Sequence, residues 1–230
     1  MVDERFFDLR GKTEEELKII WYLVGVSISK YRKPRDTYAY TNQWKSSSRK
    51  LVKIVKSNLK ATEKIKTEES KGYRYYRLSV ESEELSDSLS KFGLDNKITE
   101  RTFPEVPVKY LDHLVRGFWD GNVSCVNTQS EPSYIRKKGK TSNYRYNRKI
   151  VQICFNKAFR KTLYDKLVKY AGVKSGKKIT DGVLSFCAED LIAVYRFIYR
   201  DWDFIKKHGI WVPEKKRLFD VGPKGIKLYK

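Results

Sequence analysis

The sequence predicts an α+β fold made of two similar halves. The chain has 230 residues, of which 40% are hydrophobic, enough to bury one sizeable core or two small ones. Its hydrophobic periodicity passes twice through the same order of elements: helix, extended strands, helix, extended strands, helix. The first helix is apolar nearly all round, which predicts burial against a partner of the same kind. We place the first half at residues 1–105, the second at 106–203, and a basic C-terminal extension at 204–230.

The first half begins with a clear helix start. The segment T-E-E-E from Thr13 is a capping box, in which a hydroxyl and a carboxylate three residues apart satisfy free backbone amides. Later, alternation puts Leu78 on a face that packs and Arg77 on a face that is free to bind. We expect a strand at residues 38–41, a helix capped by the serines at 46–48, a strand at 72–80, and a closing helix from Ser82 to Gly93.

The second half repeats this order from Pro107, a residue suited to the first turn of a helix. In the extension, Trp211 and Phe219 are large apolar residues, so we expect this segment to dock on the core. The predicted elements are a helix that ends at Gly121, a strand at 151–155, a helix that ends at Gly172, a hairpin at 173–186 that turns at Asp181-Gly182, and a last helix before residue 200.

Charge points to an anionic partner. Lys and Arg number 49 against 28 Asp and Glu, and the net charge of +21 is spread along the whole chain. A polyanion such as DNA releases condensed counterions when a basic surface binds it, which favours strong and salt-dependent binding. An anionic membrane would satisfy the same charge, but no apolar run approaches the roughly 20 residues of a membrane span. The N-terminus lacks the pattern of a signal peptide, so we expect a cytoplasmic protein.

Cysteine and histidine give no sign of a metal site or a disulfide framework. The three cysteines, Cys125, Cys154 and Cys187, are odd in number and far apart, and only His113 and His208 accompany them. We expect each cysteine to pack in the core as a small apolar side chain. The sequence therefore predicts no metal cofactor of this type.

One segment, from Ser82 to Ser124, contains several short motifs in a specific order. It includes S-E-E-L-S-D-S-L-S-K-F-G-L-D-N-K-I-T, then F-P-E-V-P, then Y-L-D-H-L-V-R-G-F-W-D-G-N-V-S. This segment resembles the one that leads into the second motif helix of LAGLIDADG homing endonucleases, where that helix ends in a pattern like R-G-F-F-D-G-D-G-S. The matching residues are Gly93, Lys97, Pro104, Pro107, Arg116, Gly117, Asp120 and Gly121. A first, degenerate copy, W-Y-L-V-G-V-S-I-S-K-Y, matches mainly through Gly25.

The resemblance implies a single-chain, monomeric member with two pseudo-symmetric halves, each of the order αββαββα. The two motif helices would pack closely at Gly25 and Gly117. The two sheets would form a saddle in the major groove of duplex DNA, where base edges carry a distinguishable code.

The family hydrolyses DNA with divalent metals held by an acid at the foot of each motif helix. Counting from the motif glycine, the acid positions hold Lys30 and Asn122. A lysine opposes a divalent cation, and a neutral amide is a poor ligand for Mg²⁺. Asp120 is a weak candidate, since in the family pattern this aspartate is more often a helix-end residue. An aspartate-to-asparagine change made at position 122 to trap a DNA complex would not also explain Lys30. We therefore expect a DNA-binding protein that has lost nuclease activity.

Basic and tyrosine residues that cluster on predicted strands and loops form the candidate DNA-binding surface. The densest run lies at residues 134–149, where no acid interrupts the cations. Long basic side chains reach phosphates, while tyrosine and amide side chains can meet sugars or base edges. The predicted DNA-binding residues are Lys30, Arg32, Lys33, Arg35, Tyr38, Tyr40, Arg74, Arg77, Arg136, Lys137, Lys138, Lys140, Tyr144, Arg145, Arg148, Lys149, Gln152, Lys174, Lys177 and Lys178.

Three functions remain open at this point. The leading one is a transcriptional or architectural DNA binder. The second is an active site-specific endonuclease that uses Mg²⁺, which divalent-dependent cleavage of a long asymmetric site would reveal. The third is an RNA-binding intron maturase, which a preference for structured intron RNA over duplex DNA would reveal.

Overall fold

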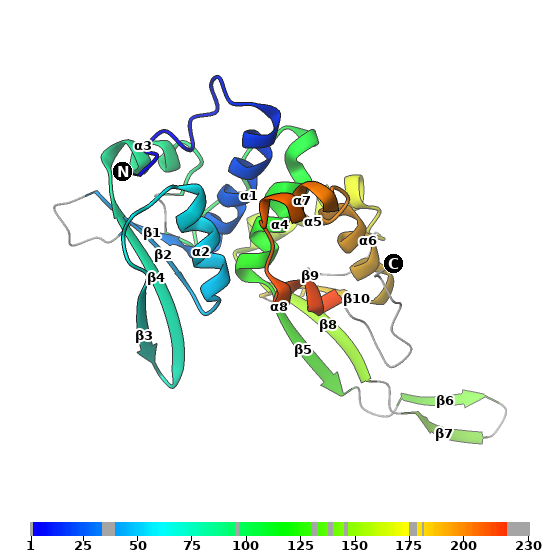
Figure 1. Cartoon of the computed structure of the whole chain (residues 1–230). Helices are drawn as coiled ribbons and strands as arrows, with labels where there is room; N and C mark the ends of the chain where they lie inside the picture. Colours follow the sequence, from blue (N-terminus) through cyan, green and yellow to red (C-terminus); the bar gives the residue numbers. More distant parts are fainter. Residues whose placement is uncertain are drawn as a thin grey trace.

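A computed structural model describes residues 2–33, 40–94, 97–129, 133–137, 140–144, 147–174, 179–180 and 182–219 (Figure 1). The first half contains α1 (Glu14–Lys30), β1 (Tyr31–Arg32), β2 (Thr41–Ser46), α2 (Arg49–Asn58), β3 (Lys66–Ser70), β4 (Tyr73–Glu81) and α3 (Glu83–Ser90). The second half contains the 3-10 turn η1 (Val108–Tyr110), α4 (Leu111–Asn122), β5 (Ser124–Gln129), β6 (Ser133–Lys137), β7 (Lys140–Tyr144), β8 (Asn147–Cys154), α5 (Lys157–Ala171), β9 (Ile179–Thr180), β10 (Val183–Cys187) and α6 (Ala188–Ile198). The C-terminal segment adds α7 (Trp202–His208), α8 (Pro213–Lys216) and the 3-10 turn η2 (Arg217–Phe219).

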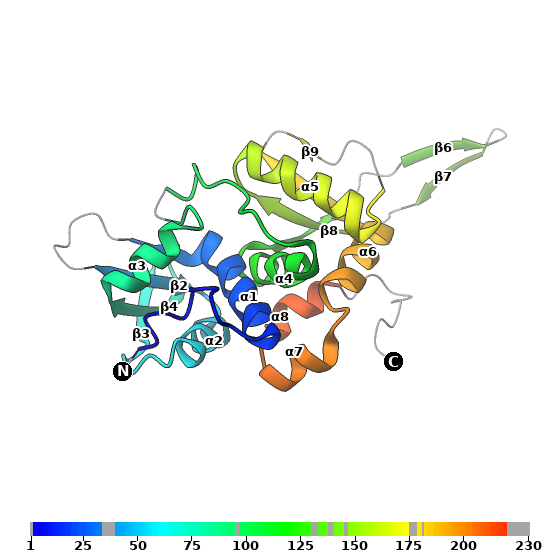
Figure 2. The ribbon, with the colours of Figure 1, turned by 90° about the horizontal axis from the view of Figure 1, so that it is seen from above.

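The predicted α+β fold with two similar halves is confirmed by the topology of its sheets. Both four-stranded sheets are antiparallel, with the order β1-β2-β4-β3 in the first half and β5-β8-β10-β9 in the second. The two orders correspond strand for strand, because β1 matches β5, β2 matches β8, β4 matches β10 and β3 matches β9. The hairpin β6–β7 is an insertion between β5 and β8, and it projects away from the body (Figures 1 and 2).

Helices α1 and α4 lie side by side at the centre, with one sheet to either side (Figure 2). The predicted capping box starts α1: the Thr13 amide donates to the Glu16 carboxylate at 2.8 Å, and the Glu16 amide donates to the Thr13 hydroxyl at 3.3 Å. Every residue from Ile20 to Ile28 is buried. The all-round apolar character of this helix therefore reflects its central place, covered by α4 and by its own sheet.

Two predictions about the strands were wrong. The strand expected at residues 38–41 begins later, since β2 starts at Thr41 and Tyr40 precedes it; residues 34–39 lie outside the described part. Trp44 fixes this register, because its buried indole donates to the Ser27 hydroxyl of α1 at 2.9 Å. Cys154 is exposed rather than buried, since alternation along β8 turns its neighbour Ile153 into the core.

The C-terminal segment docks, as predicted, over its described residues up to Phe219. Phe219 is fully buried and stacks on Trp119 of α4, with 4.8 Å between ring centroids. At the other end, Lys207 on α7 forms an ion pair with Glu15 at the start of α1. The segment therefore follows the helix pair along its length. Within the described residues, no helix combines the length and the hydropathy needed to cross a bilayer.

Candidate nucleic-acid interface

The contact between α1 and α4 depends on two glycines. A Cβ atom placed on Gly117 would lie 1.9 Å from the carbonyl oxygen of Tyr22, and one placed on Gly25 would lie 2.1 Å from that of Leu114. Both clashes are with backbone atoms of the facing helix, which cannot move independently. The two helix ends are thereby held close together between the two sheets.

A buried polar cluster accompanies this contact. The Tyr22 hydroxyl of α1 donates to Asp120 Oδ2 of α4 at 2.8 Å, and the Arg116 guanidinium lies 4.8 Å from the centre of the Tyr22 ring. Burial raises the pKa of Asp120 to about 7, although the Tyr22 hydroxyl, Arg116 and Lys215 act in the opposite direction. Asp120 is 1% exposed, so its carboxyl faces the helix contact rather than solvent.

Arg101, in the connection between the halves, holds the last turn of α1. Its guanidinium is buried and donates to the carbonyl oxygens of Ser27, Ile28 and Tyr31 at 2.7 to 3.0 Å, and to that of Leu94 at 2.7 Å. Carbonyls at a helix C-terminus lack intrahelical partners and carry partial negative charge, so a cation stabilises them. This arginine fixes the place of Lys30, the last residue of the helix.

We use the term helix foot for the C-terminal ends of α1 and α4, where Lys30 and Asn122 lie. Lys30 comes two positions before Arg32, which pairs with Gln43 of β2. Asn122 comes two positions before Ser124, which pairs with Gln152 of β8, the strand that corresponds to β2. Topology therefore makes Lys30 and Asn122 equivalent, independently of any motif. The Asn122 amide donates to the carbonyl oxygen of Cys154 at 3.4 Å.

Lys30 lies in a cationic environment. It is half-buried, and desolvation, Lys215 and Arg32 together lower its pKa to about 8. In the described part of the chain, no acid forms an ion pair with Lys30. A desolvated charge without a counter-ion is costly, which makes the helix foot suited to an anion.

The free face of the first sheet carries rows of polar and basic side chains. Cross-strand pairing aligns Arg32, Gln43 and Ser79 in one row. The next row on this face aligns Lys45, Arg77 and Lys66. Leu78 and Val80 point to the core, as predicted for β4. Such a face can meet phosphates through its cations and base edges through its amide and hydroxyl groups.

Acids on β3 neutralise part of this first sheet. Glu68 forms ion pairs with Lys45 and Arg77, both at 2.8 Å, and Glu69 lies 3.4 Å from Arg74. These pairs are at least a quarter exposed, so each contributes little to stability and can exchange for a phosphate. Arg74 lies on the opposite face of the hairpin from Arg77, because it is three residues away along a strand of period two.

The second sheet matches the first at its central row. Gln152 of β8 pairs across with Ser185 of β10, as Gln43 of β2 pairs with Ser79 of β4. All four side chains are half-buried. From this sheet the β6–β7 hairpin extends the surface outward (Figure 1), and a two-stranded ribbon has the width that a DNA major groove admits.

The three-dimensional arrangement has known counterparts. No protein-family model and no curated protein sequence matches the chain. Among solved structures, the homing endonuclease I-WcaI bound to its DNA recognition sequence is similar over 94% of this chain and 97% of its own, with 11% identity and a TM-score of 0.52. Meganuclease I-SmaMI bound to uncleaveable DNA with a TTCT central four is similar over 87% of this chain and 88% of its own, with 14% identity and a TM-score of 0.51.

The chain has the fold of LAGLIDADG homing endonucleases. At these identities the similarity establishes the fold alone. What the LAGLIDADG fold can do in this protein depends on the residues at its helix foot and on its sheets.

The residues at the helix foot do not fit a divalent metal. Lys30 and Asn122 occupy the two positions where the LAGLIDADG pattern has acids, and neither provides a carboxylate. Asp120, the weak candidate, is buried and hydrogen-bonded to Tyr22. Across the described ranges, no three His, Cys, Asp or Glu side chains gather in one place.

The predicted DNA-binding residues divide into groups. Lys30 lies at the helix foot, Arg32 and Arg77 share the free face of the first sheet, and Lys33 lies 5.5 Å from the Tyr40 ring centre. Lys174 forms an ion pair with Glu189 on α6. Arg136 and Lys137 are in β6, Lys140 and Tyr144 are in β7, and Arg148, Lys149 and Gln152 are in β8. Arg35, Tyr38, Lys138, Arg145, Lys177 and Lys178 lie outside the described residues.

Sequence reasoning missed several residues of this surface. Gln43, Lys45 and Ser79 belong to it only because of strand register, and Arg101 and Lys215 act through distant contacts. The register itself could have been found from Leu78 and Val80, whose burial sets which residues of β4 face outward. Arg101 and Lys215 carry no such signal among 49 cations.

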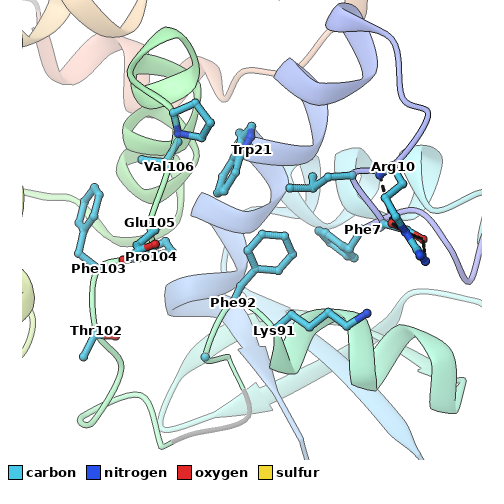
Figure 3. A pocket seen from close by; sticks show the side chains of 14 residues that line it. Phe7, Arg10, Trp21, Lys91, Phe92, Thr102, Phe103, Pro104, Glu105 and Val106 are labelled. Carbon is cyan, nitrogen blue, oxygen red and sulfur yellow. Dashed lines mark hydrogen bonds and ion pairs between the residues drawn. The ribbon is translucent and has the colours of Figure 1, made fainter.

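A separate groove, of about 1030 Å³, lies between α1, the end of α3 and the connection at residues 102–107 (Figure 3). Trp21, Phe92 and Phe103 line it together with two prolines, and its Arg10 is ion-paired with Asp8. None of its lining residues belongs to the helix foot or to the strands of the two sheets.

Proposed function

We propose that this protein binds duplex DNA along its two sheets and does not cleave it. The observation that carries the proposal is the helix foot, where a half-buried lysine and an amide stand at the two equivalent positions of a LAGLIDADG fold. The cations and amides on the flanking sheet faces support the same conclusion, since they match phosphates and base edges. The net charge of +21 supplies long-range attraction to DNA.

Duplex DNA is the favoured partner over RNA because a pair of sheets and a projecting ribbon suit a wide major groove. The major groove of an RNA duplex is deep and narrow, so side chains cannot read it. The similar solved proteins I-WcaI and I-SmaMI are bound to DNA in their structures. Since one chain contains both halves, we propose that it acts as a monomer.

A protein that binds a DNA site and leaves it intact controls access to that site. We therefore propose a role in regulation, such as control of transcription, at the DNA itself. No metal cofactor is needed for binding, because lysine and arginine side chains neutralise phosphates directly. Regulation by this protein would depend on its occupancy of a specific site.

Binding should depend steeply on salt. If about eight phosphates are contacted, the slope of log K against log salt is about −7, and affinity falls about 10⁴-fold between 50 and 200 mM salt. The measurement is a fluorescence anisotropy titration of a labelled duplex at several KCl concentrations, with structured RNA as competitor. A slope near zero would contradict the electrostatic basis of the proposal, and tighter binding of the RNA would favour a maturase role.

A further inference from the structure

Lys215 of α8 reaches the helix foot from the C-terminal segment. Its ammonium group donates to the carbonyl oxygen of Val123, the C-cap residue that follows α4. Arg101 plays the corresponding part at the end of α1, so each helix of the pair ends against a cation from elsewhere in the chain. A helix C-terminus carries partial negative charge, which explains why Lys215 donates to the Val123 carbonyl oxygen. Lys215 also acts on Lys30, and the helix charge does not explain that second effect.

The second effect is on Lys30. A Cβ atom placed on Gly121 of α4 would lie 3.6 Å from Lys30 Cγ, so the Lys30 side chain passes beside the same end of α4 that Lys215 contacts. There Lys215 and Arg32 disfavour the charged form of Lys30 and lower its pKa. Lys215 is itself half-buried, and burial lowers its pKa while Asp120 and Glu214 raise it. The Asp120 carboxyl is already hydrogen-bonded to Tyr22 within the helix contact. Two half-buried lysines thus reach the same helix foot, where a bound anion would offset their desolvation and their mutual repulsion.

The C-terminal segment is held firmly enough to supply such a group. Ile210, Val212 and Phe219 on either side of Lys215 are buried. The neighbouring Lys216 has its ammonium 3.6 Å from the centre of the Trp202 ring. A lysine positioned by packing on both sides loses less conformational entropy on binding than a free surface lysine.

We infer that Lys30 and Lys215 together form a phosphate-binding site at the helix foot, which takes a backbone phosphate of duplex DNA. The C-terminal segment is then part of the DNA-binding surface. This inference rests on the proposed function, because it places the phosphate at the midpoint between the two DNA-binding sheets. The site would replace metal-bridged carboxylates with two direct ammonium contacts, which hold the phosphate without activating water.

The test compares Lys30→Met, Lys215→Met and the double variant with the unaltered chain, at several salt concentrations. Losing both contacts should weaken DNA binding by tenfold or more and make the salt slope less steep by about 0.9, the value for one neutralised phosphate. The matched control is Lys207→Met, which removes one charge from the same segment but at the Glu15 end of the helix pair. It should leave the slope unchanged.

A change in folding is separated from a change in binding in two ways. Lys215→Arg keeps both the charge and a donor for the Val123 carbonyl, so it should restore most of the affinity. In addition, a neutral methylphosphonate at the central phosphates of the duplex should weaken binding to the unaltered chain but not to the double variant. An equal methylphosphonate penalty for both proteins would overturn the inference. If the unaltered chain does not bind duplex DNA at all, the proposed function itself fails.

Discussion

Replacing Gly117 by alanine should lower the free energy of unfolding by about 3 kcal/mol or more, one of the two largest effects that we expect of any single change. The added methyl would lie 1.9 Å from the Tyr22 carbonyl oxygen, so α1 and α4 would have to separate. Their separation would also break the hydrogen bond between Tyr22 and Asp120. Urea denaturation followed by circular dichroism measures the loss.

Two further variants make this experiment specific. Gly25→Ala should be comparably destabilising, because its methyl would lie 2.1 Å from the Leu114 carbonyl oxygen. Ser57→Ala, at an exposed position on α2, adds alanine to a helix surface and should have almost no effect. A loss below about 1 kcal/mol for Gly117→Ala would show that the helices part easily and that the close contact does not hold the halves together.

Replacing Arg101 by methionine should have the second large effect on the free energy of unfolding. Methionine keeps much of the apolar stem but removes donors to four carbonyl oxygens, three of them at the end of α1. We expect the free energy of unfolding to fall by roughly 3–5 kcal/mol, since buried acceptors would lose a charged partner. Because Lys30 belongs to the same turn, DNA affinity should fall as well, even under conditions in which the protein is folded.

Thermal unfolding and DNA titration of Arg101→Met, with Arg196→Met as control, would measure both effects. Arg196 is an exposed arginine on α6 and carries the same charge. If both variants lose similar stability, the contacts of Arg101 with the end of α1 do not stabilise the protein. If Arg101→Met is destabilised but binds DNA normally, the helix foot takes no part in binding.

Much of the fold could be predicted from the sequence because local signals agree with it. The capping box at Thr13, the alternation around Leu78 and the glycine at residue 172 each specify an element on physical grounds, and all are found. The limits of β2 could not be predicted. Its place depends on Trp44, which reaches across to Ser27 of α1, and a contact between distant residues leaves no local pattern.

The candidate site was only partly predictable for the same reason. The motif glycines indicate that Lys30 and Asn122 lie at the helix foot, and the sheet topology places them at equivalent positions. In contrast, the pairing of Arg77 with Glu68 depends on strand register between β3 and β4. The approach of Lys215 depends on packing of Phe219 against Trp119, more than ninety residues away in the chain.

The central claim is that the protein binds a specific DNA site and leaves it intact. The most direct measurement selects bound sequences from a random duplex library at moderate salt, then incubates the selected duplex and the protein with Mg²⁺ and with Mn²⁺. We predict a defined site whose two strands stay unbroken with either metal, because the helix foot presents Lys30, Asn122 and Lys215, while the carboxyl of Asp120 is buried against Tyr22. Metal-dependent strand breaks within the selected site would contradict the account and show that Asp120 or another acid holds a catalytic metal.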